Sequence, residues 1–230
     1  MLDELKEQVC EANRLLGRSG LVTLTWGNAS GIDRQHGLVA IKPSGVSYEA
    51  LTAEHIVVVN LEGKRVEGKL NPSSDTPTHL VLYKAFAGIG GITHTHSLHA
   101  CMFAQARREI PCLGTTHADV FYGAVPVTRG LSQEEIQSNY EANTGAVIVE
   151  RFRALNPADM PGALVAYHGP FTWGKSALAS VENGIALEAI ARMALGTLQL
   201  DPGICQISSH LMKKHYTRKH GPNAYYGQEE

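Results

Sequence analysis

The sequence of 230 residues predicts a single α/β domain in which a mixed, largely antiparallel sheet is flanked by helices. Segments with helical and strand periodicity alternate along the chain. Several connections between predicted strands are too short for the helical crossover that a parallel pair requires. No internal repeat or low-complexity linker divides the chain, and its length is enough to bury a substantial core. We therefore expect residues 1–230 to form one domain.

The first third of the chain predicts one helix followed by short strands. Apolar residues recur at steps of three and four from Leu2 to Leu16, which is typical of an amphipathic helix, and Gly17 and Gly20 end it. Runs rich in β-branched residues predict strands at 22–25, 38–41 and 56–60, with a hairpin turn at Glu62-Gly63.

The remaining elements are marked mainly by their first residues. Thr76-Pro77 opens a helix, because proline suits the first helical turn. Ser132 and Glu135 form a capping box, which predicts a helix start. Further strands are predicted at 91–96, 111–113 and 163–167, and further helices at 97–106, from Ser176 to about Leu198 and from about Ile204 through His215.

Charge and composition exclude several classes of protein. Lys plus Arg is 20 and Asp plus Glu is 22, so the net charge of −2 favours neither nucleic-acid nor membrane-surface partners, and the basic run at 213–220 is typical of a solvated helix face. No apolar run is long enough to span a bilayer, and the N-terminus lacks a signal peptide. Four scattered cysteines indicate a reducing compartment, so we expect a cytoplasmic protein.

The sequence contains eleven histidines, and three of them form a candidate metal site. His94 and His96 are two residues apart on a predicted strand. Because successive side chains of a strand point to opposite sides, these two point to the same side, about 7 Å apart. His168 follows the predicted strand at 163–167 and faces a loop. Three histidines with an open position are typical of catalytic zinc, although paired surface or core histidines and a loop histidine would give the same pattern.

Three loops of small polar residues predict an anion site. They cover 26–30, 42–45 and 71–75, and they offer backbone N–H groups, hydroxyls and Lys42 to a phosphate. Ser73 and Ser74 directly precede a predicted helix, whose N-terminus favours an anion. Each loop taken singly is equally compatible with an ordinary turn, and Asp75 with a helix cap.

The motifs together resemble the class II aldolase/epimerase family, which includes L-ribulose-5-phosphate 4-epimerases and L-fuculose-phosphate aldolases. The resemblance runs from Glu4 to Gln228 and is nearest to the epimerase branch, because Asp75 stands where the aldolases have Glu. The motifs that carry it, in chain order, are WGNAS (26–30), KPSG (42–45), PSSD (72–75), THTHS (93–97), GTTHAD (114–119), HGPFTWG (168–174) and KHYTRKHGPNAYYGQ (214–228).

The resemblance implies a three-layer α/β/α fold and a role for each motif. It implies one zinc ion per subunit, or another divalent metal, at His94, His96 and His168, with Asp75 grouped beside them. Asp119 and Tyr226 would be the acid/base pair, with His215 in support. The positions that match or suit the substrate phosphate are Gly27, Asn28, Lys42, Ser44, Gly45, Ser73 and Ser74.

The implied reaction is epimerisation at C4 of L-ribulose 5-phosphate through cleavage and recondensation of the C3–C4 bond. The implied assembly is a homotetramer with active sites at subunit interfaces, to which the tail 215–230 contributes and in which a neighbouring chain would supply Tyr226. Alternatives are a fuculose-phosphate-like aldolase, a metal-dependent hydrolase of barrel type and a non-catalytic zinc-binding module. The roles of His79, His99 and His117 stay open between support of the site and simple packing.

Overall fold

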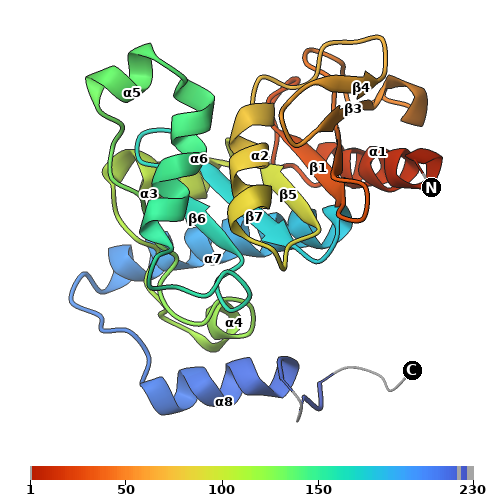
Figure 1. Cartoon of the computed structure of the whole chain (residues 1–230). Coiled ribbons are helices and arrows are strands. Elements are labelled where there is room, and N and C mark those ends of the chain that lie inside the picture. The colour runs from red at the N-terminus through yellow and green to blue at the C-terminus, as the bar shows by residue number, and fades with distance from the viewer. Residues whose placement is uncertain (1, 222–223, 227–230) are drawn as a thin grey trace.

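The computed structural model of the chain describes residues 2–221 and 224–226 (Figure 1). Residues 222–223 and 227–230 of the expected C-terminal tail therefore lie outside the described residues. The helices are α1 (Leu2–Arg18), α2 (Thr76–Ala85), α3 (Leu98–Ala106), α4 (Thr115–Ala118), α5 (Gln133–Gln137), α6 (Tyr140–Arg151), α7 (Ala177–Leu200) and α8 (Ser209–Lys219). The strands are β1 (Asn28–Asp33), β2 (Leu38–Ile41), β3 (Val57–Asn60), β4 (Arg65–Glu67), β5 (Gly91–His94), β6 (Gly162–Leu164) and β7 (Pro170–Gly174).

All seven described strands belong to one sheet in the order β4-β3-β2-β1-β5-β7-β6. Every neighbouring pair is antiparallel, so the expectation of a partly parallel sheet was wrong. The helical connections β4-α2-β5 and β5-α3-α4-α5-α6-β6 do not return the chain to a parallel neighbour, because β5 pairs with β1 and β7 instead. The sheet is open rather than closed into a (βα)₈ barrel, which removes the barrel-type hydrolase from consideration.

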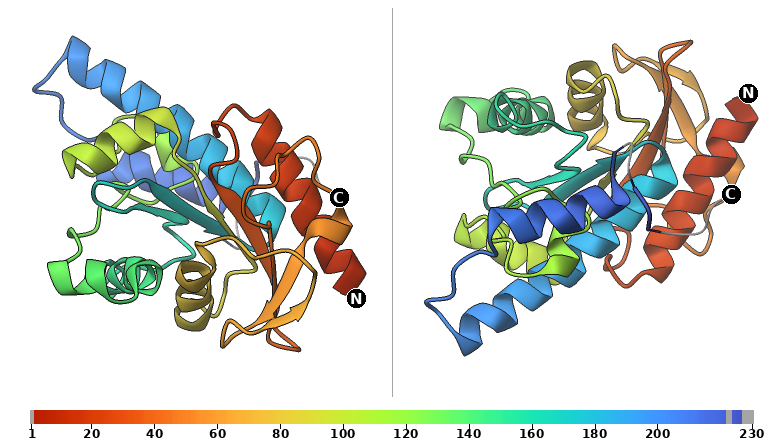
Figure 2. Two further views of the ribbon diagram at one scale, coloured as in Figure 1. Left: turned by 90° about the horizontal axis from the view of Figure 1, so that it is seen from above. Right: turned by 90° about the horizontal axis from the view of Figure 1, so that it is seen from below.

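Helices cover both faces of the sheet, as the three-layer expectation requires (Figure 2). Helices α2 and α6 pack together on one face, whereas α1, α3 and α7 lie on the other. Alternation along β3 supplies both layers of the core: Val57 and Val59 pack with Leu80 of α2, and Val58 packs with Leu16 of α1. None of the helices in the described part of the chain is long and apolar enough to cross a bilayer.

The central strand β1 was not predicted, and the strand predicted at 22–25 is wrong. Residues 22–25 instead form a bend and turn in which Leu24 has a positive φ of 54°. The β1 sequence Asn-Ala-Ser-Gly-Ile-Asp has low strand propensity. It becomes a strand because β2 and β5 pair on both sides and because buried Asn13 of α1 donates to the Ala29 carbonyl at 2.9 Å and accepts from its N–H at 2.8 Å. Tertiary contacts therefore override local preference here.

Several predicted boundaries also shift. The strand predicted at 91–96 ends at His94, and the one at 163–167 ends at Leu164, since Tyr167 turns the chain with a φ of 66°. Residues 111–113 do not form a strand, and the last helix begins only at Ser209, where the Ser208 hydroxyl accepts from the Leu211 N–H.

The capping box at Ser132 is confirmed, because its hydroxyl accepts from the Glu135 N–H at 3.2 Å. The hairpin turn predicted at Glu62-Gly63 is confirmed, because β3 and β4 pair antiparallel across it. Strand β7 and helices α4 and α6 were not predicted.

Candidate active site

One cavity of about 400 Å³ gathers the predicted metal and phosphate residues. Its walls come from the loop before β1, the loops after β2 and before α2, the last residue of β5, the first turn of α6 and the turn before β7. Sequence spacing could not show that these segments meet. The predicted residues that line it are Gly27, Asn28, Lys42, Ser44, Gly45, Ser73, Ser74, Asp75, His94, His96 and His168.

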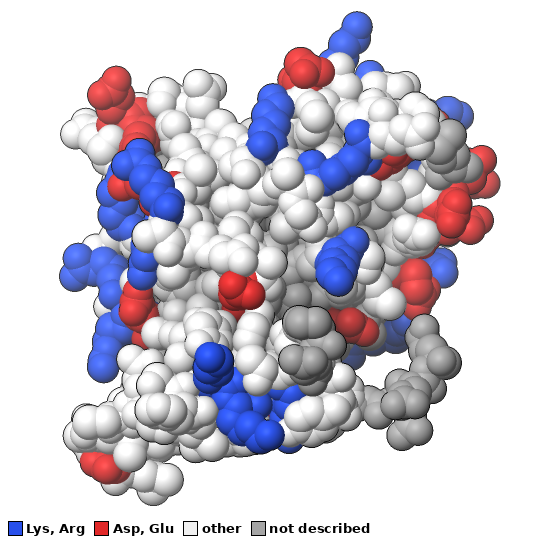
Figure 3. Space-filling view, turned by 60° about the horizontal axis from the view of Figure 1, so that its bottom comes forward, with Lys and Arg blue, Asp and Glu red and all other residues white. Residues whose placement is uncertain are grey.

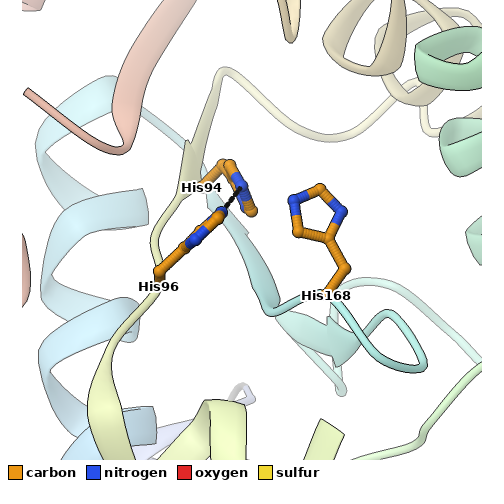
Figure 4. Close-up of side chains that lie close together, drawn as sticks. All are labelled: His94, His96 and His168. Carbon is orange, nitrogen blue, oxygen red and sulfur yellow. Dashed lines mark hydrogen bonds between the residues drawn. The ribbon is translucent and has the colours of Figure 1, made fainter. Parts of the chain in front are cut away.

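The rings of His94, His96 and His168, which all line this cavity, lie close together (Figure 4). Each offers a ring nitrogen, and these nitrogens all lie within 4.8 Å of one another. The Nε2 atoms of His94 and His96 are 3.0 Å apart. Two imidazoles bound to one zinc ion have a similar separation, because Zn–N bonds are about 2.0–2.1 Å long. His96 reaches this position from beyond the end of β5, so strand alternation alone does not explain the convergence.

The orientation of His94 is set by the residues around its ring. Its Nδ1 lies 3.0 Å from the Pro170 carbonyl oxygen and donates to it, which leaves a lone pair on Nε2. The Phe171 ring stacks on the imidazole with centroids 4.1 Å apart. Gly27 allows the backbone to pass close by, since a Cβ there would lie 2.8 Å from the His94 carbonyl oxygen, and its φ of 84° also favours glycine.

The chemistry of the three donors fits a divalent metal ion. Burial, together with His94 and His96, lowers the pKa of His168 to about 3, and burial likewise lowers the pKa of His96. Both rings are therefore neutral near pH 7, as a metal ligand must be. The buried Nδ1 of His168 has no hydrogen-bond partner among the described residues. Neutral, converging imidazoles with an unpartnered nitrogen are the donor set of a zinc-type site.

Lys42 gives the cavity a buried positive charge. Its side chain is 1% exposed, and its Nζ contacts the Pro43 carbonyl oxygen at 3.3 Å and lies 4.8 Å from the centre of the Tyr48 ring. Burial lowers the pKa of Lys42 to about 8. Among the described residues it forms no salt bridge. A buried ammonium group without a carboxylate favours an anionic ligand beside it.

The loops at 42–45 and 71–75 are joined by backbone hydrogen bonds. Ser44 N–H donates to the Asn71 carbonyl at 3.0 Å, and Ser73 N–H donates to the Lys42 carbonyl at 3.1 Å. The exposed Ser44, Gly45 and Ser74 are thereby held at the mouth of the cavity, beside the N-terminus of α2.

Asn28, the first residue of β1, is hydrogen-bonded to the loop before α2. Its Nδ2 donates to the Ser73 hydroxyl at 3.0 Å and to the Asp75 carboxylate at 2.7 Å, whereas its buried Oδ1 has no partner among the described residues. Burial opposes ionisation of Asp75, but His94, His79 and the Asn28 amide together hold its pKa below the ordinary value. Asp75 thus lies as an anion in the cavity, outside the group of three ligand nitrogens.

The first turn of α6 supplies wall residues that sequence analysis missed. Tyr140 and Glu141 line the cavity, and the Tyr140 ring stacks on His168 with centroids 6.3 Å apart. The Thr78 hydroxyl of α2 donates to the Glu141 carbonyl at 2.6 Å, which joins the two helices at this point. Trp26, half exposed, lies 6.1 Å from His96 on another side. The periodicity of 140–151 is weak, and no motif marks its start.

The predicted acid/base residues form a separate cluster at the end of α4, on α8 and in the segment after α8. Asp119 accepts from Arg218 at 2.6 and 3.1 Å and from His215 Nδ1 at 3.1 Å. Burial opposes ionisation of Asp119, but the Arg218 and His215 hydrogen bonds lower its pKa. Tyr226 is 61% exposed, and Lys219 Nζ lies 4.3 Å from its ring centre. Figure 3 shows the basic side chains that gather over α8.

This second cluster borders a different cavity of about 540 Å³. Asp119, Lys219 and Tyr226 line it together with Gly88 and Gly174. Gly174 pairs with Gly91 at the start of β5, whereas His94 pairs with Phe171 at its end. Three residue steps along a strand are about 10 Å. Within one chain, the predicted acid/base residues and the three histidines therefore lie at opposite ends of the same strand pair.

The three histidines left open have defined surroundings. His79 is fully buried, and its Nδ1 lies 2.7 Å from the Ser30 hydroxyl, which in turn contacts the Tyr83 hydroxyl at 2.8 Å. His117 is buried, and its Nε2 donates to the Gly123 carbonyl at 2.7 Å. His99 bonds to Glu188 of α7 at 2.7 Å. His117 is thus a packed residue with a local partner, the His79 N–H donates to the Asp75 carbonyl at 3.1 Å, and His99 joins the first turn of α3 to α7.

The fold and the site together define a metal-dependent protein of the class II aldolase type. The model of the class II aldolase and adducin N-terminal domain matches residues 7–195, and the chain belongs to this family. The sequence is also 54% identical over 228 residues to L-ribulose-5-phosphate 4-epimerase UlaF of Salmonella paratyphi A and of Salmonella typhi, covering 99% of this chain and 100% of each relative.

Solved structures of the family have the same fold. An L-fuculose 1-phosphate aldolase superimposes with a TM-score of 0.79 at 23% identity, covering 94% of this chain and 95% of the other. The L-fuculose 1-phosphate aldolase of Glaciozyma antarctica PI12 gives a TM-score of 0.76 at 20% identity, covering 96% and 84%. At these identities the likeness establishes the fold and says nothing about the substrate.

Proposed function

We propose that the protein is a zinc-dependent L-ribulose-5-phosphate 4-epimerase that interconverts L-ribulose 5-phosphate and D-xylulose 5-phosphate. The observation that carries the proposal is the cavity in which three converging imidazoles lie together with buried Lys42, which forms no salt bridge with any residue that the structure describes. The full-length identity to named epimerases supports the choice of substrate. The free cysteines Cys10, Cys101, Cys112 and Cys205 support a reducing, cytoplasmic location.

Binding of the substrate phosphate is assigned to Lys42 and the loops around it. A dianion beside Nζ would compensate the buried ammonium charge, and the N–H groups and hydroxyls of Ser44, Gly45 and Ser74 are placed at the same mouth. The phosphate would stay anchored while the C3–C4 bond is broken. The aldehyde fragment can then rotate and present its other face without leaving the cavity.

Cleavage of the C3–C4 bond leaves negative charge on the fragment that carries the ketone. His94, His96 and His168 would hold the zinc ion, whose Lewis acidity stabilises charge of this kind. Imidazole ligands bind a metal ion in the neutral form, so they would leave the positive charge of the ion undiminished. Asp75 lies beside them as an anion held by Asn28. The unpartnered Oδ1 of Asn28 is available to accept a hydrogen bond from a sugar hydroxyl.

Inversion at C4 needs a proton acceptor and a proton donor on opposite faces of the aldehyde. We assign these roles to Asp119 and Tyr226, with His215 orienting Asp119 through its 3.1 Å contact. The low pKa of Asp119 keeps its carboxylate able to accept a hydrogen bond at neutral pH.

The position of this pair supports assembly of the active site from two subunits. Asp119, His215 and Tyr226 lie at the far end of β5 from the histidines of their own chain. They are also linked to each other through Arg218, so one subunit would present them as a unit. A homotetramer in which each α4–α8 cluster faces the zinc cavity of a neighbour satisfies both observations.

The decisive assay separates epimerase from aldolase. The protein loaded with zinc is incubated with L-ribulose 5-phosphate, and the products are followed over time. We expect D-xylulose 5-phosphate to form, and a His94→Asn variant to lose this activity. Accumulation of free glycolaldehyde phosphate as the main product would favour the fuculose-phosphate-like aldolase. Zinc binding without turnover of either kind would favour a non-catalytic zinc-binding module.

A further inference from the structure

Helix α3 begins directly after the second metal-site histidine, and a residue from another helix caps it. Its own N-cap residue, Ser97, makes no side-chain capping bond. Instead the Glu188 carboxylate of α7 accepts from the His99 N–H at 2.9 Å and from the Ala100 N–H at 3.0 Å. It also bonds to His99 Nδ1 at 2.7 Å. One carboxylate thus satisfies two free N–H groups of the first turn and opposes the positive end of the helix dipole.

The same helix also holds the turn that carries His168. The Cys101 thiol lies 3.5 Å from the His168 carbonyl oxygen and donates to it. About one turn further along α3, the Ala104 carbonyl accepts from the Tyr167 N–H at 3.0 Å. Tyr167 adopts a positive φ of 66°, which a residue with a side chain rarely does, so this turn depends on contacts outside itself. Helix α3 is therefore attached to His96 by the chain and to the turn that carries His168 by two hydrogen bonds, one to the His168 carbonyl and one from the Tyr167 N–H.

We propose that Glu188 is a positioning residue that sets the relative placement of His96 and His168 by anchoring α3 to α7. This inference rests on the proposed metal site. Glu188 is well placed for the task, because its neighbours Leu187, Ile190 and Ala191 are buried in the core and keep α7 in place. Metal ligands must be held within about 0.5 Å of their working positions. A small shift of the first turn of α3 is therefore enough to weaken metal binding.

The test uses the full chain with Glu188→Gln and, as a matched control, Glu182→Gln, which makes the same change at an exposed position of α7. The glutamine amide keeps the shape but turns an NH₂ group toward one of the donors. We expect zinc affinity, measured against a chromophoric chelator, to fall about 10-fold in Glu188→Gln. We also expect the visible spectrum of the cobalt-loaded protein to change. The control should match wild type in both measurements.

A second variant keeps the inference testable if Glu188→Gln fails to fold. Cys101→Ala leaves the cap in place but removes the bond from α3 to the His168 carbonyl, and we expect it too to weaken zinc binding and alter the cobalt spectrum. Wild-type affinity and spectrum in a folded Glu188→Gln, or in Cys101→Ala if the first variant is unfolded, would overturn the inference and leave the proposed function standing. If wild type binds zinc no better than His94→Asn does, the proposed metal site itself fails.

Discussion

Replacing Lys42 by methionine should change stability and phosphate binding in opposite directions. The substitution keeps nearly the same volume in a side chain that is 1% exposed, and it removes the charge. Burial lowers the pKa of Lys42 from 10.5 to about 8, which corresponds to about 3 kcal/mol at 1.36 kcal/mol per pKa unit. Loss of the contact with the Tyr48 ring offsets about 1–2 kcal/mol of that gain.

The ligand-free Lys42→Met protein should therefore be about 1–2 kcal/mol more stable than wild type at pH 7. For a chain of this size the gain corresponds to a rise in Tm of about 2–8 °C. The variant also loses a charge-assisted hydrogen bond to the substrate phosphate, worth about 1.5–3 kcal/mol, so KM should rise about 10- to 100-fold.

The pH dependence gives an independent check of the sign. The folded-state pKa of Lys42 lies below its unfolded value, so burial of the ammonium group costs stability fully below pH 8. That cost disappears between about pH 8 and 10.5, and the stability advantage of Lys42→Met should shrink over this range. Wild-type KM should rise above about pH 8, where Lys42 becomes neutral in the free protein.

Differential scanning calorimetry and steady-state kinetics measure both effects. Lys84→Met, on an exposed part of α2, is the matched control and should change neither quantity by much. A Lys42→Met protein with a lower Tm and an unchanged KM would refute the reasoning, because Lys42 would then be a structural residue rather than an anion receptor.

The other predictions concern assembly and packing. Mixing inactive His94→Asn with inactive Tyr226→Phe and allowing subunits to exchange should restore activity at about one site in four, since random assortment pairs an intact cavity with an intact tail; no recovery in verified hybrids would place both residues in one chain. Gly91→Ala should lower the free energy of unfolding by about 1–3 kcal/mol or more, because its Cβ would lie 2.3 Å from the Ala177 nitrogen. Gly88→Ala, with no atom within 4 Å of the new Cβ, should leave urea unfolding nearly unchanged, and equal effects in the two variants would contradict the packing argument.

Regular elements were predictable where one short-range rule dominates. The stepped apolar residues of α1, the runs rich in β-branched residues at β2 and β3, and the capping box at Ser132 all lie in the structure where the sequence predicts them. Strand β1 could not be found in this way, because its pairing partners and Asn13 supply the order that its own residues lack. Tyr140 could not be predicted as a site residue either, because its place beside His168 depends on the packing of α6 against α2.

The sequence by itself determined the chemistry that this protein can offer: three histidines, a lysine among small polar loops, and an Asp and a Tyr far from them in the chain. Those are properties of side chains and of short motifs, and they do not depend on how the chain folds. Only the tertiary structure decided which of them share a cavity. The antiparallel pairing of β5 with β1 and β7 brings Asn28, His94 and the turn of His168 to one end of the sheet. The same pairing leaves Asp119 and Tyr226 beside the other end, since contacts between distant segments form only when the whole sheet is assembled.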